Sequence, residues 1–190
     1  AARVVNQHID VATAGGEVIS FVGTVDRVDT YEKNGTKYIR VVDYKTGEKK
    51  FKLEDVYYGI NMQMLMYLFT LTDKQSGKYE NAVPAGVLYM PAKEADAELD
   101  RNAGEDEADK VRDSIYKMNG IVLDSSDVIL AMEKEAAGVY IPVAMTQKGE
   151  YSARSSLINL SQLERLKEYA DRLVKNMAEK LYHGEIEAIP

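Results

Sequence analysis

The chain has 190 residues, 45% hydrophobic and 29% charged. That is the balance of an ordinary globular protein, and it excludes a disordered, collagen-like or coiled-coil chain. With no cysteine and two histidines, these residues hold no disulfide scaffold, thiolate zinc site or thiol nucleophile, which leaves hard oxygen ligands for any metal. No apolar run reaches the length of a membrane span, so no membrane partner is expected.

The net charge of −7 is unevenly distributed along the chain. The segment Arg27–Lys52 contains eight basic and four acidic residues, whereas Lys93–Asp113 contains four basic and nine acidic residues. The acidic excess therefore lies largely in one later segment. The earlier, basic segment can therefore still contact a polyanion.

The first half of the chain predicts two strands and then a helix. Val18–Tyr31 and Thr36–Lys45 are rich in β-branched and apolar residues. Asn34-Gly35 lies between them and predicts a two-residue hairpin loop, because both central positions of a type I′ turn need positive φ. Leu53–Leu71 follows as a helix that is apolar on most faces, so we expect it to be buried.

The second half predicts short strands and one long helix. Ser161 and Glu164 form a capping-box pattern, apolar residues then recur at helical spacing, and Gly184 ends the helix. The other predicted elements are strands at Val83–Met90, Ile121–Leu123 and Val139–Val143, with a polar loop or loosely held helix at Lys93–Lys110. We expect a single α/β domain over residues 1–190, excised from a longer chain. Its central sheet is flanked by the Leu53–Leu71 and Ser161–His183 helices.

The hairpin register brings two carboxylates and a lysine together. If Lys33 faces Thr36, Asp26 lies opposite Asp43, and alternation places Lys45 on the same face. Opposed carboxylates repel each other unless a cation lies between them, and Mg²⁺ or Mn²⁺ suits such oxygen ligands. A nearby ammonium group completes a site for metal-assisted phosphodiester hydrolysis. The alternative is two surface strands with scattered charges, and spacing alone leaves the two interpretations balanced.

Two polar residues in the following helix bear on this site. Gln63 and Tyr67 are four residues apart, so they share a helix face within an otherwise apolar run. They either point toward the site or toward a DNA strand, or they belong to the core, where Gln63 bonds a backbone group and Tyr67 packs. For each residue taken singly, the core interpretation is favoured.

Three short motifs, in this order and spacing, resemble the RecB-type branch of the PD-(D/E)XK nucleases. They are Gly23-Thr24-Val25-Asp26-Arg27-Val28-Asp29, Val42-Asp43-Tyr44-Lys45-Thr46-Gly47 and Gln63-Met64-Leu65-Met66-Tyr67. The resemblance implies a restriction-endonuclease-like mixed sheet flanked by helices. It also implies that Asp26, Asp43 and Lys45 are the metal-binding and catalytic residues, and that Gln63 and Tyr67 belong to the motif of the RecB branch.

Later segments resemble AddB, the nuclease-bearing subunit of the bacterial AddAB helicase–nucleases. These are Pro84–Tyr89, Tyr116–Asp124, Lys148–Ser156 and Gly184–Pro190, so the resemblance runs from about Val18 to the end. It implies a cytoplasmic Mg²⁺-dependent DNA exonuclease that works with an AddA-type helicase–nuclease subunit and prepares double-strand ends for recombinational repair. The family's four-cysteine iron–sulfur cluster cannot form in this chain, and most of its cysteines are expected just beyond residue 190.

Other candidate residues have weaker support. His8 is either a metal ligand or a surface histidine, and the surface interpretation is favoured. Arg154, with Ser155 and Ser156, either binds a DNA backbone or belongs to an ordinary loop. The remaining candidates are Arg27, Lys49, Lys50 and Lys52 as phosphate contacts or a solvated face, and Tyr57 and Tyr58 as base-stacking groups or, by preference, core residues.

Two other functions compete with the AddB-type nuclease. One is a stand-alone RecB-like nuclease of a phage or of CRISPR adaptation, which the AddB-like second half disfavours. The other is a catalytically silent DNA-binding or scaffolding module. The presence of all three core residues, Asp26, Asp43 and Lys45, disfavours the silent module.

Overall fold

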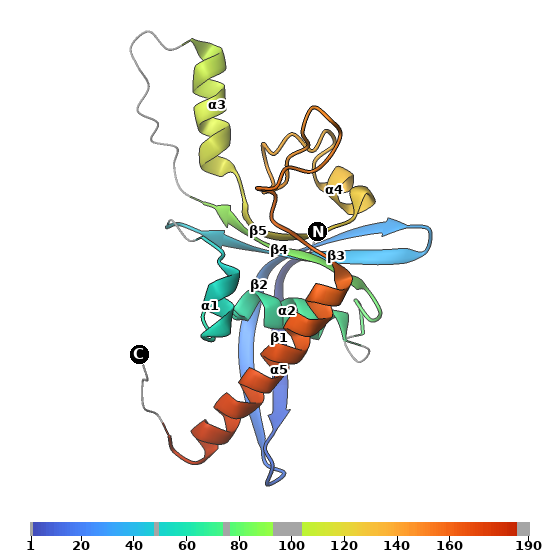
Figure 1. Cartoon of the computed structure of the whole chain (residues 1–190). Helices are drawn as coiled ribbons and strands as arrows, with labels where there is room; N and C mark the ends of the chain where they lie inside the picture. Colours follow the sequence, from blue (N-terminus) through green and yellow to red (C-terminus); the bar gives the residue numbers. More distant parts are fainter. Residues whose placement is uncertain (1, 48–49, 74–76, 93–103, 186–190) are drawn as a thin grey trace.

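A mixed sheet with helices on both faces forms the framework of the protein (Figure 1). The computed structural model describes residues 2–47, 50–73, 77–92 and 104–185. The six strands are ordered β1-β2-β3-β4-β5-β6 across the sheet. Their bounds are β1 Ala2–Ala12, β2 Val18–Lys33, β3 Thr36–Lys45, β4 Val83–Pro91, β5 Asn119–Leu123 and β6 Leu157–Ile158. The predicted α/β fold class is confirmed.

The β2–β3 hairpin forms as the sequence predicts. Asn34 and Gly35 have φ values of 51° and 76°, the left-handed conformation that a tight hairpin loop requires. The antiparallel pairs run from Lys33–Thr36 to Arg27–Val42, which is the predicted register. On its other edge β3 pairs in parallel with β4, from Tyr38–Val83 to Lys45–Pro91.

Strand β1 was not predicted from the sequence. It pairs antiparallel with β2 from Ala2–Val28 to Ala12–Val18. The first part of β2 therefore pairs with β1, and the ladder with β3 begins only at Arg27. The sheet continues through an antiparallel β4–β5 pair and a short parallel β5–β6 pair. His8 lies on β1 and is exposed, as the surface interpretation of this residue predicts.

The helices are α1 Leu53–Tyr57, α2 Gln63–Thr72, α3 Glu105–Tyr116, α4 Ser126–Met132 and α5 Leu160–Tyr182. In Figure 1, α2 and α5 lie on one side of the sheet and α4 on the other. Side chains alternate along β3, so Val41 packs into the core under α2 and α5, while Val42 packs with Ile129 of α4. None of the described helices is long and apolar enough to cross a membrane.

The single helix predicted over Leu53–Leu71 is wrong. The structure has two helices, α1 and α2, separated by Gly59 (φ 77°) and Asn61 (φ 61°). These two left-handed residues end α1, and the Asn61 side-chain amide donates a hydrogen bond to the Asp55 carboxylate at 2.8 Å. The break turns Tyr57 and Tyr58 outward, so the preferred prediction that they are core residues is also wrong.

The long C-terminal helix α5 begins earlier than predicted. Asn159, rather than Ser161, is the capping residue: its side chain accepts from the backbone N–H of Gln162, and the Gln162 side chain accepts from that of Asn159. This reciprocal pair is a capping box shifted by two residues. Gly184 adopts φ 75° just after the helix, as its predicted role as a stop requires.

The strand predicted at Val139–Val143 does not form. The segment is irregular, although Ile141 and Val143 are buried as a strand core would be. Glu133 explains the difference, because its carboxylate accepts hydrogen bonds from the backbone N–H groups of Val139, Tyr140 and Ile141 at 2.9–3.1 Å. One buried carboxylate thus replaces a neighbouring strand as the acceptor.

The acidic segment predicted as a loop or a loosely held helix is helical in its described part. Residues 93–103 lie outside the described residues, and α3 begins at Glu105 and extends to Tyr116. In Figure 1, α3 projects away from the sheet.

Candidate active site

The candidate site lies where β2 and β3 separate. The ladder between these strands ends at Arg27–Val42, one step before the predicted Asp26–Asp43 pair. Beyond that point β3 stays paired with β4 through Lys45–Pro91, while β2 stays paired with β1. The end of β3 therefore opens on its β2 side. This is the place to which the sequence assigns the catalytic residues.

Asp26 reaches across this opening with its side chain. Its Oδ2 accepts a hydrogen bond from the backbone N–H of Tyr44 at 3.0 Å. A side-chain oxygen thus bonds the N–H beside Asp43, and no further backbone pair is formed there. The hydrogen bond holds the Asp26 carboxylate beside the last three residues of β3.

Asp43 and Lys45 project together from the face of β3 that carries Val41. The Asp43 side chain is 15% exposed, and its Oδ2 lies 2.5 Å from Lys45 Nζ. The contact is an ion pair that is not aligned as a hydrogen bond, and within the described part of the chain the buried Asp43 Oδ2 accepts no hydrogen bond. A buried carboxylate oxygen in this state has capacity for a further ligand.

Tyr89 forms the wall of the site on the β4 side, and no motif in the sequence points to it. It pairs with Asp43 across the parallel β3–β4 ladder, and Lys45 Nζ lies 5.7 Å from its ring centroid. Burial, and secondly the negative charge of Asp43, raises the pKa of the Tyr89 phenol to about 12. The signal was present in the apolar Val83–Met90 run, but only the β3–β4 register places Tyr89 beside Asp43.

The residues present fit a small divalent cation. Asp26 and Asp43 supply hard oxygen donors, and one oxygen of Asp43 is buried without a hydrogen bond. No group of three or more His, Cys, Asp or Glu side chains suited to a metal occurs among the residues that the structure describes. Mg²⁺ commonly takes only one or two carboxylates and fills its other positions with water and substrate phosphate. The donor set therefore suits a Mg²⁺ or Mn²⁺ ion that keeps water ligands, rather than an ion that is bound by protein ligands alone.

Gln63 and Tyr67 interact with each other at the start of α2. Gln63 Nε2 donates a hydrogen bond to Tyr67 Oη at 2.7 Å, with Tyr67 buried and Gln63 exposed. The phenol lies against β2 at Gly23, where an added Cβ atom would stand 1.8 Å from Tyr67 Oη. Gly23 is therefore required for this close approach of α2 to β2, three residues before Asp26.

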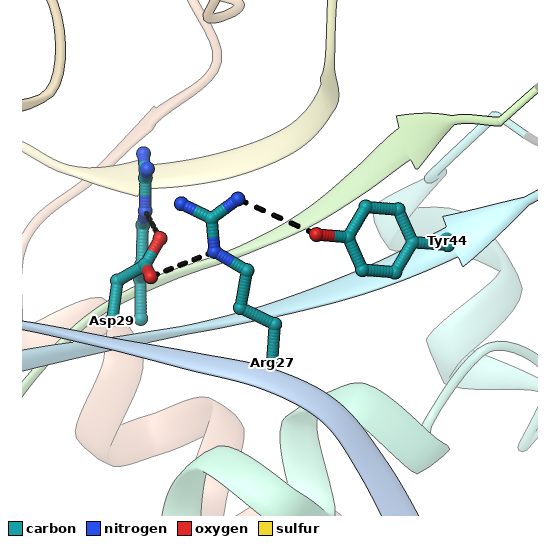
Figure 2. A network of polar contacts seen from close by, with 4 residues as sticks. Arg27, Asp29 and Tyr44 are labelled. Atoms are coloured by element: carbon teal, nitrogen blue, oxygen red, sulfur yellow. Dashed lines mark hydrogen bonds and ion pairs between the residues drawn. The ribbon is translucent and has the colours of Figure 1, made fainter. Parts of the chain in front are cut away.

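Arg27 takes part in a polar network rather than lying on an open basic face. Figure 2 shows its guanidinium between Asp29 and Tyr44, with Nε 2.8 Å from Asp29 Oδ1 and Nη1 3.4 Å from Tyr44 Oη. Arg40 binds the other Asp29 oxygen at 3.0 Å. Burial alone would raise the pKa of Asp29, but the hydrogen bonds and charges of the two arginines outweigh it and lower that pKa. The network joins β2 to the end of β3 on the opposite face of the hairpin.

Arg154 lies in an exposed loop at the end of the sheet where β5 begins. Its backbone N–H donates to Ser152 Oγ at 3.3 Å, and Ser155 Oγ exchanges hydrogen bonds with the Ala144 backbone. Arg154, Ser155, Ser156 and Lys50 are among the residues that line one hollow. Lys49 falls outside the described residues, and Lys52 is exposed before α1.

The chain is similar to known proteins over nearly its whole length. The chain is 36% identical over 186 residues to a protein of Clostridium kluyveri (strain NBRC 12016) that is named as a subunit of an ATP-dependent helicase/deoxyribonuclease. It is 30% identical over 184 residues to the protein of the same name from Thermoanaerobacter sp. (strain X514). Each alignment covers 96% of this chain and 16% of the relative, so the chain spans about a sixth of the length of these proteins.

A family model described as "PD-(D/E)XK nuclease superfamily" matches residues 2–190. This range includes β1, the open end of the β2–β3 hairpin and helix α5. The mixed six-stranded sheet with flanking helices is consistent with the fold of this family. The chain belongs to the PD-(D/E)XK nuclease superfamily.

Proposed function

We propose that this chain is the DNA exonuclease domain of an AddB-type subunit and that it hydrolyses phosphodiester bonds with the help of a divalent cation. The observation that carries the proposal is the open end of β3. There the Lys45 ammonium contacts the buried Oδ2 of Asp43, and the Asp26 carboxylate accepts a hydrogen bond from the backbone N–H of Tyr44, the residue between them. The deoxyribonuclease name of the relatives supports the same activity.

Asp26 and Asp43 would hold the cation, Mg²⁺ or Mn²⁺, through carboxylate oxygens. When bound, such an ion polarises a phosphate oxygen and lowers the pKa of a bound water. Lys45, held against Asp43 at 2.5 Å, positions the attacking water or offsets the charge that develops on the phosphoryl oxygens. The Gln63–Tyr67 pair supports the site by fixing α2 against β2 at Gly23. Arg154 contacts the DNA backbone.

The wider role in a helicase–nuclease complex is proposed on the same terms. Their shared name assigns helicase and deoxyribonuclease activity to a complex in which the named chain is one subunit. We propose that this domain acts there beside an AddA-type helicase–nuclease, on DNA ends prepared for recombinational repair. The iron–sulfur cluster expected of the family would need cysteines that these 190 residues do not contain.

Calorimetric titration with Mn²⁺ tests the metal site directly. The unmodified chain is expected to bind Mn²⁺, and Asp43→Ala is expected to abolish binding because it removes the buried donor oxygen. Asp171→Ala is the matched control, since Asp171 is an exposed aspartate on α5. Equal Mn²⁺ binding by the unmodified chain and Asp43→Ala would contradict the proposed metal ligands.

Cleavage of labelled DNA separates the nuclease from a silent binding module. With Mn²⁺ present, the unmodified chain is expected to shorten DNA from an end, and Asp43→Ala is not. Metal-dependent DNA binding without any cleavage would favour the silent module.

A further inference from the structure

We propose that Tyr89 is a positioning residue of the candidate active site, and that the face of its ring holds the Lys45 ammonium group when a divalent cation occupies the Asp43 carboxylate. The inference rests on the proposed nuclease function and gives Tyr89 a part in it that neither the metal ligands nor Lys45 supply. Lys45 Nζ contacts both side chains in the structure: it lies 2.5 Å from Asp43 Oδ2 and 5.7 Å from the centroid of the Tyr89 ring.

Asp43 Oδ2 cannot serve the lysine and a divalent cation equally well. The two cations repel each other, and the doubly charged ion attracts the carboxylate more strongly than an ammonium group does. Once Oδ2 is a metal ligand, the ion pair that fixes Lys45 is therefore weakened. The Lys45 side chain is long, flexible and 30% exposed, so it would then turn toward solvent. Its proposed role beside the attacking water requires a second contact that keeps the ammonium group in the site.

The Tyr89 ring suits this second contact because it attracts an ammonium group but not a hard metal ion. The electron-rich face of an aromatic ring binds an ammonium group that lies within about 6 Å of the ring centroid, which is the case for Lys45. Mg²⁺ prefers oxygen ligands and gives up its water reluctantly, so the ring does not compete with the carboxylates for the metal. The ring therefore offers Lys45 a contact that the metal ion does not take.

The Tyr89 ring is held in place by its surroundings. Tyr89 is 3% exposed, and backbone pairing joins it to Asp43 on β3 and to Asn119 on β5. Asn119 Oδ1 accepts a hydrogen bond from the backbone N–H of Phe51 at 2.6 Å, and the Phe51 ring centroid lies 6.3 Å from that of Tyr89. A side chain that is fixed by packing can orient the group that it holds, as the support of a catalytic lysine requires.

Rates of DNA cleavage at saturating Mn²⁺ test this role. Tyr89→Leu removes the ring and is expected to lower kcat about ten-fold, whereas Tyr89→Phe keeps the ring and should retain kcat within about two-fold. The KM for DNA should not change, because the buried Tyr89 does not contact the substrate. In the Lys45→Ala background Tyr89→Leu should have no further effect, since the ring then has no ammonium group to hold. A merely structural loss would lower the rate by the same factor in both backgrounds.

Tyr79→Leu is the matched control for the loss of a buried ring. Tyr79 is 4% exposed, belongs to the same core cluster as Tyr89 and has Lys78 Nζ 5.2 Å from its ring centroid. It precedes β4, at the end of that strand opposite to Tyr89. The control is expected to leave kcat unchanged. Urea unfolding of both leucine variants measures their stability, so that a lower kcat in Tyr89→Leu alone is assigned to the site.

Nuclear magnetic resonance of the Lys45 ε-methylene group tests the contact without cleavage. Protons that lie over the face of an aromatic ring resonate upfield, and the Lys45 signal is assigned by its absence in Lys45→Ala. An upfield signal is expected in the unmodified chain and in Tyr89→Phe, both without metal and after Mg²⁺ is added. In Tyr89→Leu the signal should lie with those of exposed lysines.

The outcomes separate this inference from the proposed function. If the Lys45 signal joins those of exposed lysines when Mg²⁺ binds, or if Tyr89→Leu cleaves DNA at the unmodified rate, the positioning role is overturned while the metal site stands. Equal losses of kcat in Tyr89→Phe and Tyr89→Leu would also overturn it, since the hydroxyl group and not the ring face would then matter. Mn²⁺ binding that survives in Asp43→Ala contradicts the metal site itself, and the inference falls with it.

Discussion

Two carboxylates of this protein are largely withdrawn from solvent and have opposite surroundings. Glu133 is 7% exposed and accepts three backbone hydrogen bonds, from Val139, Tyr140 and Ile141. Asp43 is 15% exposed, and its Oδ2 is buried with a lysine beside it but no hydrogen bond. The Glu133 oxygens are satisfied by backbone hydrogen bonds, whereas the buried Asp43 oxygen has the Lys45 ammonium beside it and no hydrogen bond. We propose that this difference separates a structural carboxylate from a functional one.

The largest expected effect comes from removing the Lys45 ammonium group beside the Asp43 carboxylate. Lys45→Ala should lower the rate of DNA cleavage at saturating Mn²⁺ by at least about 100-fold, because charge stabilisation in the transition state is lost. Mn²⁺ affinity should be kept or increased, since Lys45 no longer competes for Asp43 Oδ2. Cleavage rates and calorimetry measure the two effects separately. Lys33→Ala, which breaks an exposed ion pair with Asp127, is the control.

If Lys45→Ala cleaves DNA at the unmodified rate, the ammonium group has no part in the chemistry. The proposal that Asp43 is functional and Glu133 structural would then depend on the Asp43 carboxylate alone, without Lys45.

On the structural side of the comparison, Glu133→Gln should lower the free energy of unfolding by about 3 kcal/mol. One amide oxygen replaces two carboxylate oxygens, and the new amide N–H₂ faces backbone donors rather than acceptors. Urea unfolding measures the loss. Glu135→Gln, at an exposed neighbouring position, should change the stability very little. A Glu133→Gln variant as stable as the unmodified chain would show that the 139–141 segment is held by other contacts.

The same contrast shows what the sequence predicts well and where it fails. The β2–β3 hairpin was predicted in type and register, because Asn34-Gly35 and the flanking strands are local signals. The strand expected at Val139–Val143 fails because Glu133, six residues earlier, supplies the acceptors that a neighbouring strand would otherwise provide. That choice is made by tertiary packing and leaves no mark in a hydrophobic pattern.

The candidate site shows a similar division. Asp26, Asp43 and Lys45 could be predicted to lie together from the register and the motifs, and the structure brings them to the open end of β3, while their catalytic role stays a prediction. Tyr89 could not, because its place beside Asp43 depends on a parallel pairing between strands far apart in sequence. The break between α1 and α2 was missed for a related reason: Gly59 and Asn61 adopt positive φ within a run that is otherwise apolar and helix-compatible.

Neutralising the Asp43 carboxylate is expected to change the free energy of unfolding less than Glu133→Gln does. Asp43→Asn should leave the free energy of unfolding unchanged or raise it by about 1 kcal/mol, as is common for functional residues that carry a stability cost. The substitution removes a buried charge without a hydrogen bond, and the partly exposed ion pair with Lys45 contributes little. Urea unfolding beside Glu133→Gln tests this directly. A loss comparable to that of Glu133→Gln would make Asp43 structural and end the contrast.

The smallest expected effect is on the titration of Tyr89. Burial, and then the charge of Asp43, raises the Tyr89 pKa from 10.0 to about 12, so the neutral phenol is favoured in the folded protein. Its contribution to stability is therefore complete below pH 10 and is lost as the pH rises toward 12. In Asp43→Asn the Tyr89 pKa should fall but stay above 10.0, because burial remains.

The tyrosinate ultraviolet difference spectrum, taken between each protein and its Tyr89→Phe variant, isolates this one phenol among thirteen tyrosines. An unchanged Tyr89 pKa in Asp43→Asn would mean that Lys45 already neutralises Asp43 toward its neighbours. The charge of Asp43 would then be fully compensated by Lys45, much as the charge of Glu133 is compensated by its backbone hydrogen bonds. The buried Asp43 oxygen would no longer be evidence for a bound cation. A lower pKa would show that the carboxylate still projects negative charge into the site, which is what attracts a divalent cation.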